Sequence, residues 1–391
     1  MRSLMLVVLL TASIASPATV TAQQPAAKPR ARDLGVPFDG TPGPLNAITD
    51  VMGVEVGHTT LISGEGEHAN RTGVTVVFPK GKKWEPVFAG TFAGNGFGDL
   101  IGTHWVDEGG VLGGPVAITN TWSVGTARDA VLAWFEQELK VPIDWHQPVV
   151  GETSDALLND IAGFHVRQEH VFAALSGAKS GPVAEGNVGG GTGMVCHGFK
   201  GGIGTSSRRV TAAGARYTVG VLVQANHGSR PQLTIAGVPV GREFSDSTGR
   251  GAPPPPLPPR IDGSREGSII VVVATDAPLL PHQLQRLARR VPMGIARVGG
   301  TASNGSGDIF IAFSTANPGA GRAAGGPVDL KMLPNETESA FFSATIEAVE
   351  ESIVNALVAA VTMTGARGRT VQALPHDRLR EILRKYNRLH G

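Results

Sequence analysis

The chain has 391 residues, of which 41% are hydrophobic and 17% are charged, and its formal net charge is +1. This length and composition indicate a globular protein with room for one large core or two domains, and they exclude a coiled coil or a disordered chain. The balanced charge gives no sign of a nucleic-acid partner.

Residues 1–22 have the features of an export signal. Arg2 supplies the basic start, residues 4–10 form an apolar stretch, and small or modest residues end at Ala22, where we predict cleavage. The apolar stretch is too short to span a bilayer, and no other run of about 18 apolar residues occurs. We therefore expect a periplasmic or secreted protein with no membrane segment. Residues 23–33 are predicted to be a disordered lead-in.

Apolar alternation predicts most elements before residue 250 to be strands. The expected strands are 50–61, 72–78, 113–119, 149–153 and 217–226, with glycine-rich turns at 93–99, 187–194 and 200–205. One helix is expected over 126–139, where the apolar residues share a face. The glycines at 93–99 lack the Gly-Lys-Ser/Thr signature of a phosphate loop, so a nucleotide site is disfavoured.

Strands and helices alternate again after residue 268. Strands are expected at 269–274, 294–298 and 309–315, the last preceded by a turn at 303–308. Helices are expected from Pro281 to Val291, over 336–364 and over 375–387. Strands followed by helices in both halves indicate a layered α+β fold, with two sheets inside and helices outside.

The chain has one cysteine, Cys196, so it has no internal disulfide. His197 follows it directly, which suggests a thiol nucleophile with an adjacent base. Neighbours on a strand point to opposite faces, however, so we interpret Cys196 as a buried structural thiol. With no second cysteine and no His-Glu-x-x-His sequence, we expect no metal and no cofactor.

The junction between Gly267 and Ser268 is the most informative point of the sequence. Prolines are dense at 252–259 and hold the chain extended and solvated, and ten residues later an apolar strand begins. Glycine permits a strained backbone there, and a hydroxyl follows at the first position of a rigid element. These are the ingredients for Ser268 Oγ to attack the Gly267 carbonyl. The alternative is an ordinary linker with a Gly-Ser turn.

Several blocks together resemble the exported β-aminopeptidases and the related L-aminopeptidase/D-amidase/D-esterase family of self-processing serine hydrolases. They include Val-Gln-Ala-Asn-His-Gly at 223–228, Gly-Ser-Ile-Ile at 267–270 and Asn-Gly-Ser-Gly-Asp at 304–308. Further blocks lie at 53–60, 151–153, 158–160 and 274–279. The blocks occur in the same order and span nearly all of the chain after residue 22.

The resemblance implies an αββα four-layer sandwich like that of the N-terminal-nucleophile hydrolases, with different connectivity. It also implies cleavage between Gly267 and Ser268, within a single domain. The products are a large chain, 23–267, which ends in the Pro-rich processing loop 251–267, and a small chain, 268–391. The two chains are expected to stay together as a heterodimer, and four heterodimers to assemble.

The resemblance also implies a role for each of five residues. Ser268 is expected to be the nucleophile in self-cleavage and in catalysis, with Ser306 and Asp308 as the partners that orient and polarise it. Asn226 is expected to be an oxyanion-hole donor, and Glu152 to hold the free amino group of a short peptide or aminoacyl amide. From the chemistry of serine, the base is either the new α-amine of Ser268 or Ser306 relaying to Asp308.

One position departs from the family pattern. Two residues after Glu152, where an aromatic side chain is expected to line the substrate pocket, this chain has Ser154. Trp145 and Phe164 are candidates to replace that aromatic group. The preference among β-amino acid, α-amino acid and D-amide substrates therefore stays open.

Two other functions are compatible with parts of the sequence. An acyltransferase of the ornithine acetyltransferase type shares the fold, but those enzymes use threonine at the cut site and work in the cytosol. A non-enzymatic exported binding protein would make 251–267 a plain linker. It would leave the joint presence of Glu152, Asn226, Ser268, Ser306 and Asp308 unexplained.

Overall fold

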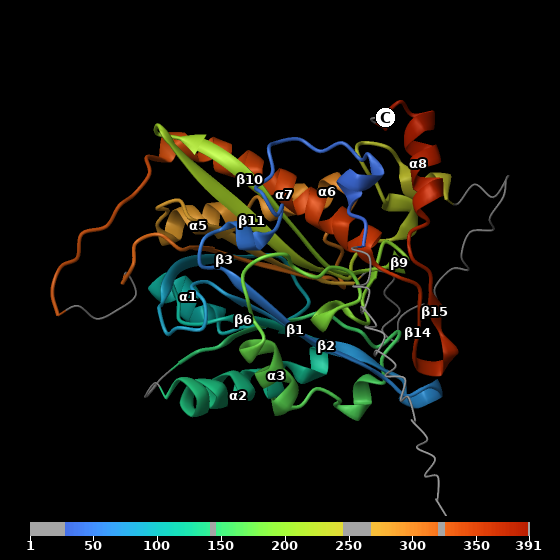
Figure 1. Cartoon of the computed structure of the whole chain (residues 1–391), viewed down its shortest axis with the longest axis horizontal. Coiled ribbons are helices and arrows are strands. Elements are labelled where there is room, and N and C mark those ends of the chain that lie inside the picture. Colours follow the sequence, from blue (N-terminus) through green and yellow to red (C-terminus); the bar gives the residue numbers. More distant parts are fainter. Residues whose placement is uncertain (1–27, 141–145, 245–266, 320–324, 390–391) are drawn as a thin grey trace, which may run out of the picture.

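The computed structural model describes residues 28–140, 146–244, 267–319 and 325–389. The expected signal peptide, the processing loop up to residue 266, and Trp145 lie outside these residues. The described chain forms four layers, with two sheets in the middle and helices above and below them (Figure 1). This confirms the expected α+β sandwich. No helix in the described ranges has the length and apolar character needed to cross a membrane.

The larger sheet has six strands and carries the Gly267-Ser268 junction. Their order is β10 (Gly202–Ala212), β11 (Ala215–Ala225), β12 (Ile269–Thr275), β13 (Gly307–Ser314), β3 (Val87–Gly96) and β5 (Val111–Leu112). Strands β12 and β13 are parallel, and the other neighbours are antiparallel. The segment after Ser268 therefore lies in the middle of the sheet, between strands from distant parts of the chain.

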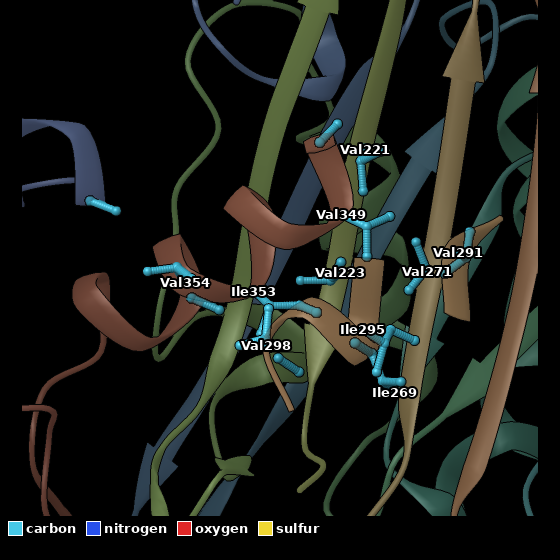
Figure 2. Packing of buried hydrophobic residues seen from close by; sticks show 14 of the residues in the cluster. Val221, Val223, Ile269, Val271, Val291, Ile295, Val298, Val349, Ile353 and Val354 are labelled. Atoms are coloured by element: carbon cyan, nitrogen blue, oxygen red, sulfur yellow. The ribbon is translucent and has the colours of Figure 1, made fainter. Parts of the chain in front are cut away.

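Strand β12 is an uninterrupted apolar run because both of its faces are covered. Ile269, Val271 and Val273 pack against the helices on one side, and residues between them pack against the second sheet. All seven residues of β12 are buried. Figure 2 shows Ile269 and Val271 on the face that meets the outer helices.

The second sheet has five strands and packs face to face on the first. Their order is β1 (Glu55–Ser63), β2 (Asn70–Phe78), β6 (Val116–Thr119), β7 (Val149–Glu152) and β4 (Leu100–Ile101). Its residues alternate between the apolar layer shared by the two sheets and the layer under the outer helices. Two short hairpins lie outside the sheets, formed by β8 (Val195–Cys196) with β9 (Phe199–Lys200) and by β14 (Met363–Thr364) with β15 (Thr370–Val371).

Each sheet is covered by its own helices (Figure 1). The six-stranded sheet lies under α5 (Pro281–Ala288), α6 (Val291–Arg297) and α7 (Glu338–Ala359). The five-stranded sheet lies under α2 (Val124–Trp134), its π-helical extension η5 (Phe135–Leu139) and α3 (Gln168–Ser176). The remaining α-helices are α1 (Thr103–Gly109), α4 (Val240–Glu243) and α8 (His376–Lys385). Short 3-10 helices are η1 (Ala31–Leu34), η2 (Ile48–Asp50), η3 (Gly66–His68), η4 (Thr121–Ser123), η6 (Ile161–Gly163), η7 (Gly189–Gly191), η8 (Arg230–Gln232), η9 (Asn335–Thr337) and η10 (Ala366–Gly368).

The structure corrects three expectations about local structure. Residues 294–297 belong to helix α6, Val298 caps that helix, and the segment is not a strand. Val291, Ile295 and Val298 recur at helical spacing and are all buried on the side facing α7 and the sheet (Figure 2). Residues 202–205, expected in a turn, begin β10, and the expected turn at 93–99 is strand up to Gly96. Gly202 and Gly204 mark close packing of β10 against neighbouring segments and do not end the strand.

The lead-in expected at 23–33 is folded at its end. Ala31 is fully buried in η1, and the arginines on each side of it reach buried carboxylates. Arg30 forms an ion pair with Glu185 at 2.7 Å, and Arg32 makes two 2.8 Å hydrogen bonds to Glu351. Charge-assisted pairs of this kind order a segment whose composition alone indicates disorder.

Helix α7 lies unusually close to strand β10. A Cβ atom added at Gly204 would stand 1.9 Å from the carbonyl oxygen of Ser352 in α7. Two residues along β10, the Ser206 hydroxyl donates to the carbonyl of Ala348 at 2.6 Å. Small side chains on β10 therefore set the distance between the helix layer and the sheet.

We predict that Gly204→Ala lowers the free energy of unfolding by about 1–3 kcal/mol, because α7 must move to admit one methyl group. Chemical denaturation measures the loss. The matched control is Gly125→Ala in α2, where nothing lies within 4 Å of the added atom and no loss is expected. Equal stability of the two variants would show that α7 does not approach β10 this closely.

Candidate active site

Three neighbouring strands of the six-stranded sheet bring four of the predicted site residues to the same end of the sheet. Ala225 at the end of β11 pairs with Ile269 in β12, and Ile269 pairs in turn with Asp308 at the start of β13. Asn226 follows Ala225, and Ser268 precedes Ile269. The sheet register thus collects residues that are up to 82 positions apart in the sequence at the same end of three neighbouring strands.

The uncut Gly267-Ser268 bond is buried and held from several directions. The Ser306 hydroxyl lies 2.6 Å from the Gly267 carbonyl oxygen and 2.6 Å from Asp308 Oδ1. The Gly307 N–H donates to Ser268 Oγ at 3.0 Å. A hydroxyl carries one hydrogen, so Ser306 donates to one of its two neighbours at a time unless Asp308 brings a proton of its own.

Gly307 is needed here for space. It lies in extended strand β13, and Ser306 and Asp308 therefore project to the same side, as residues two apart on a strand do. A Cβ atom at Gly307 would stand 2.7 Å from Gly98 Cα and 2.7 Å from the Phe97 carbonyl oxygen. The structure uses this glycine for a close approach between two chain segments.

Asn226 is fixed in an orientation that leaves a donor available. Its Oδ1 accepts the Val195 N–H at 2.8 Å, and its Nδ2 donates to the Ser154 carbonyl at 3.0 Å. The Val195 contact requires oxygen at Oδ1, so the nitrogen must face Ser154. A side-chain amide has two N–H groups, and Ser154 takes one of them.

Glu152 comes from the other sheet, at the end of β7, and its side chain is only 4% exposed. The backbone N–H of Asp99 donates to Oε1 at 3.1 Å, and the Thr121 hydroxyl donates to Oε2. Both carboxylate oxygens are therefore held by donors before any substrate enters. A carboxylate fixed in this way is pre-organised to receive a cation.

One cavity of about 500 Å³ connects Glu152 with Ser268. It lies where the ends of the two sheets meet, and Phe97, Trp122 and Ser154 also line it. Of the predicted residues, Glu152 and Ser268 thus line the same cavity. Ser306, Asp308 and Asn226 are buried beside it and are absent from the cavity lining among the described residues.

Trp122 supplies the aromatic surface that is missing at Ser154. It lies on η4, directly after β6, and its ring stacks on Phe164 with 5.5 Å between the centroids. Phe164 therefore supports the lining residue and is not itself part of the lining. Neither Trp122 nor Phe97 was predicted from the sequence. Both follow strands that end at the same edge as the predicted site, which is the signal that could have identified them.

A buried carboxyl beside the cavity wall was not predicted either. Burial raises the pKa of Asp155 to about 7, against hydrogen bonds from Thr72, Asn159 and Asn120 that favour the charged form. Asn159 Nδ2 donates to Asp155 Oδ1 at 3.1 Å, and the backbone N–H of Asn159 donates to the Asp155 carbonyl at 2.9 Å. Asp155 thereby fixes the turn whose outer residues line the cavity.

Cys196 is buried as expected, but the expectation that its neighbour points away is wrong. His197 adopts a left-handed backbone conformation, φ 47°, which breaks the alternation of a strand. Within the described chain, Cys196, His197 and His227 bring their donor atoms within 4.8 Å of one another. Burial raises the pKa of the Cys196 thiol to about 12, which disfavours a thiolate nucleophile.

Lys200 holds the segment that orients Asn226. Its ammonium is fully buried and donates to the carbonyls of Met194 and Gly201, each at 2.8 Å, and to that of Gly191 at 3.3 Å. Burial lowers the pKa of Lys200 to about 7. Three carbonyl oxygens around the ammonium fix the backbone next to Val195, and hence the N–H that Asn226 accepts.

Solved structures of known enzymes share this architecture. The L-aminopeptidase D-Ala-esterase/amidase of Ochrobactrum anthropi, described as a prototype for the serine aminopeptidases and a variant of the Ntn-hydrolase fold, superposes with a TM-score of 0.84 at 48% identity. The match covers 93% of this chain and all of that one. The β-aminopeptidase of a Burkholderia species has a TM-score of 0.81 at 50% identity, over 91% of this chain and 98% of that one.

Sequence comparison gives the same relationship. The β-peptidyl aminopeptidase BapA of Sphingosinicella microcystinivorans is 54% identical over 370 residues, which cover 92% of this chain and 93% of the relative. The model of peptidase family S58 matches residues 46–371, a range that includes all the site residues described above. The chain therefore belongs to peptidase family S58 and is an aminopeptidase, a hydrolase of peptide bonds.

Proposed function

We propose that this aminopeptidase activates itself by cutting the Gly267-Ser268 bond and then uses Ser268 as its catalytic nucleophile. It would release β-amino acids or small L-α-amino acids from the N-terminus of peptides, amides and esters. One observation carries the proposal. The Gly267 carbonyl oxygen lies 2.6 Å from the Ser306 hydroxyl, while Ser268 Oγ is held by the Gly307 N–H.

The contacts around the junction suit self-cleavage. Ser268 Oγ attacks the carbonyl carbon of Gly267, and negative charge develops on the carbonyl oxygen, where Ser306 donates its hydrogen bond. The C–N bond then breaks, its nitrogen takes a proton, and an ester links Gly267 to Ser268 Oγ. Water hydrolyses that ester and leaves a carboxylate on Gly267 and a free α-amine on Ser268.

The same groups then serve turnover. Ser268 Oγ attacks the first carbonyl of the substrate, and its proton passes to the new α-amine, whose ordinary pKa is about 7.7–8.0, or through Ser306 to Asp308. The second N–H of Asn226 is the candidate donor to the oxyanion. The leaving amine takes the proton, and water hydrolyses the acyl-enzyme.

The anchor at Glu152 explains why an enzyme of this design acts at the N-terminus. A nearly buried, pre-organised carboxylate attracts an ammonium group strongly, since little water screens the pair. Substrates whose first amino group is free would therefore bind with that group at Glu152 and the first carbonyl near Ser268. Relatives named for β-peptidyl aminopeptidase and L-aminopeptidase activities support both β- and α-amino acids as first residues.

The topology supports a heterodimer that stays together after the cut. Strand β12 of the small chain pairs with β11 of the large chain, and β13 of the small chain pairs with β3 of the large chain. Separation would break the middle of the six-stranded sheet and expose its apolar faces to water. The processed chains are therefore expected to remain one folded unit.

We extend the proposal to assembly and location. Four heterodimers are proposed to associate, and the exposed apolar residues Val328, Leu330 and Met332, which alternate along an extended arm before α7 (Figure 1), offer a contact surface for this. Export to the periplasm or the medium is proposed from residues 1–22. The family assignment disfavours the acyltransferase and binding-protein alternatives.

We predict that Ser268→Ala abolishes both cutting and hydrolysis, because one hydroxyl serves both reactions. Denaturing gels and release of p-nitroaniline from an aminoacyl p-nitroanilide measure the two outcomes. Ser303→Ala is the control, since Ser303 contributes its backbone carbonyl to the same loop and keeps it in the variant. A Ser268→Ala protein that is cut or active would overturn the proposal.

We predict that Asn226→Ala lowers kcat about 10²- to 10³-fold with a smaller change in KM, because an oxyanion donor acts mainly in the transition state. Asn226→Asp keeps the side-chain size but has no N–H to donate when ionised, so it should lose kcat as well. Steady-state kinetics on the cleaved protein give both constants. An unchanged kcat in both variants would remove Asn226 from the oxyanion hole.

We predict that Glu152→Gln raises KM at least tenfold for substrates with a free amino group, because the amide keeps the shape but loses the charge. The measurement compares one aminoacyl p-nitroanilide with its N-acetyl derivative. The wild-type enzyme should cleave only the free amine efficiently. If the variant kept wild-type KM, the ammonium anchor would have to be sought elsewhere.

A further inference from the structure

The cavity extends well beyond the groups that the chemistry uses. One wall is the turn after Asp155, and beyond it the cavity is lined by Arg367 and Arg369, which lie on and after η10 near the C-terminal end of the fold. The chemistry at Ser268 gives these two arginines no role. Nothing in the sequence motifs marks them, since they are about 100 residues from Ser268.

The loop that carries the arginines is built rigidly against the cavity wall. The Ala366 N–H donates to the Leu158 carbonyl at 2.7 Å, and a Cβ atom at Gly365 would stand 2.0 Å from the same carbonyl oxygen. Arg367 itself adopts a left-handed backbone conformation, φ 59°, which is uncommon for a residue with a side chain. The fold maintains this strained position at the cavity.

The two guanidinium groups are available for a ligand. Among the described residues, neither one makes a side-chain hydrogen bond or an ion pair. Three carboxylates also line the cavity. Glu152 is held at the far end, and Asp160 Oδ2 lies 3.3 Å from His165 Nε2 and 3.4 Å from His68 Nδ1. Glu67, on η3, is exposed and lies on the same side as η10. The two guanidinium groups therefore share the cavity with Glu67, which is exposed, and with Asp160, which is partly exposed and faces two histidines.

The direction of the substrate follows from the proposed function, on which this inference rests. Glu152 takes the ammonium and Ser268 takes the first carbonyl, so the first residue occupies the space between them. The part of the substrate beyond the scissile bond must use the rest of the cavity, which at about 500 Å³ exceeds the space that one residue needs. A short peptide ends in a carboxylate, the group that guanidinium binds in a two-point geometry.

We propose that Arg367 and Arg369 form a subsite for the C-terminal carboxylate of a short peptide. The enzyme then binds a dipeptide or tripeptide by both of its charged ends, the ammonium at Glu152 and the carboxylate at the arginines. Free di- and tripeptides are accordingly the preferred class of substrate over long chains and over C-terminal amides.

The test compares one dipeptide with its C-terminal amide and with the p-nitroanilide of the same first residue. We expect the wild-type enzyme to cleave the free acid with a kcat/KM about three- to tenfold above that of the amide, mainly through KM, because half-exposed ion pairs are modest. The double variant Arg367→Gln/Arg369→Gln should remove this preference and leave p-nitroanilide hydrolysis unchanged. Arg378→Gln, an exposed arginine on α8, is the matched control.

Two results would overturn the subsite. One is equal kcat/KM for acid and amide in the wild-type enzyme, and the other is a preference that survives in the double variant. The carboxylate that the arginines bind could be the C-terminus or an acidic first side chain. A dipeptide amide with an acidic first residue separates these two, because it has only the second. If the variants affect that substrate alone, the arginines bind a first side chain and the proposal is wrong. Hydrolysis of the p-nitroanilide, which has no carboxylate, reports separately on the proposed function.

Discussion

The burial of strand β12 between two strands of distant chain segments is the constraint on which the site depends. Ile269 is fixed by partners in both β11 and β13, so the residue just before it cannot move far. Ser268 therefore has a defined position before the bond is cut, and the same position serves afterwards. Cutting there removes a covalent link but none of the sheet pairing that holds the small chain.

The site is assembled across the two sheets, which explains the need for glycine where they approach. Glu152 comes from the five-stranded sheet and Ser268 from the six-stranded one, and the cavity lies between their ends. Gly98 permits this approach, because a Cβ atom there would stand 3.0 Å from Glu152 Oε1 of the other sheet and 3.0 Å from Gly307 Cα. Buried hydrogen bonds then fix the orientation of the side chains, as the two hydrogen bonds of the Asn226 amide show.

Local sequence places three of the candidate site residues, because Ser268 begins an apolar run and Asn226 and Glu152 stand at strand ends. The roles of the five residues follow only from the family resemblance, and Ser306 and Asp308 lie at the start of β13, where the sequence predicts a turn. Asp155, Arg367 and Arg369 could not be found in this way, since their position depends on contacts far along the chain. The prediction of a strand where helix α6 lies failed for the same reason. Its short apolar repeat fits a strand until the packing against α7 is known.

Self-cleavage at Ser268 is best tested by the mass of the purified wild-type protein under denaturing conditions. We expect two polypeptides, the smaller beginning at Ser268 and ending at Gly391, with masses that add up to the mature chain plus one water. A single intact chain that persists through long incubation, yet hydrolyses aminoacyl p-nitroanilides, would contradict it. The nucleophile would then have to be a residue other than a newly formed N-terminal serine.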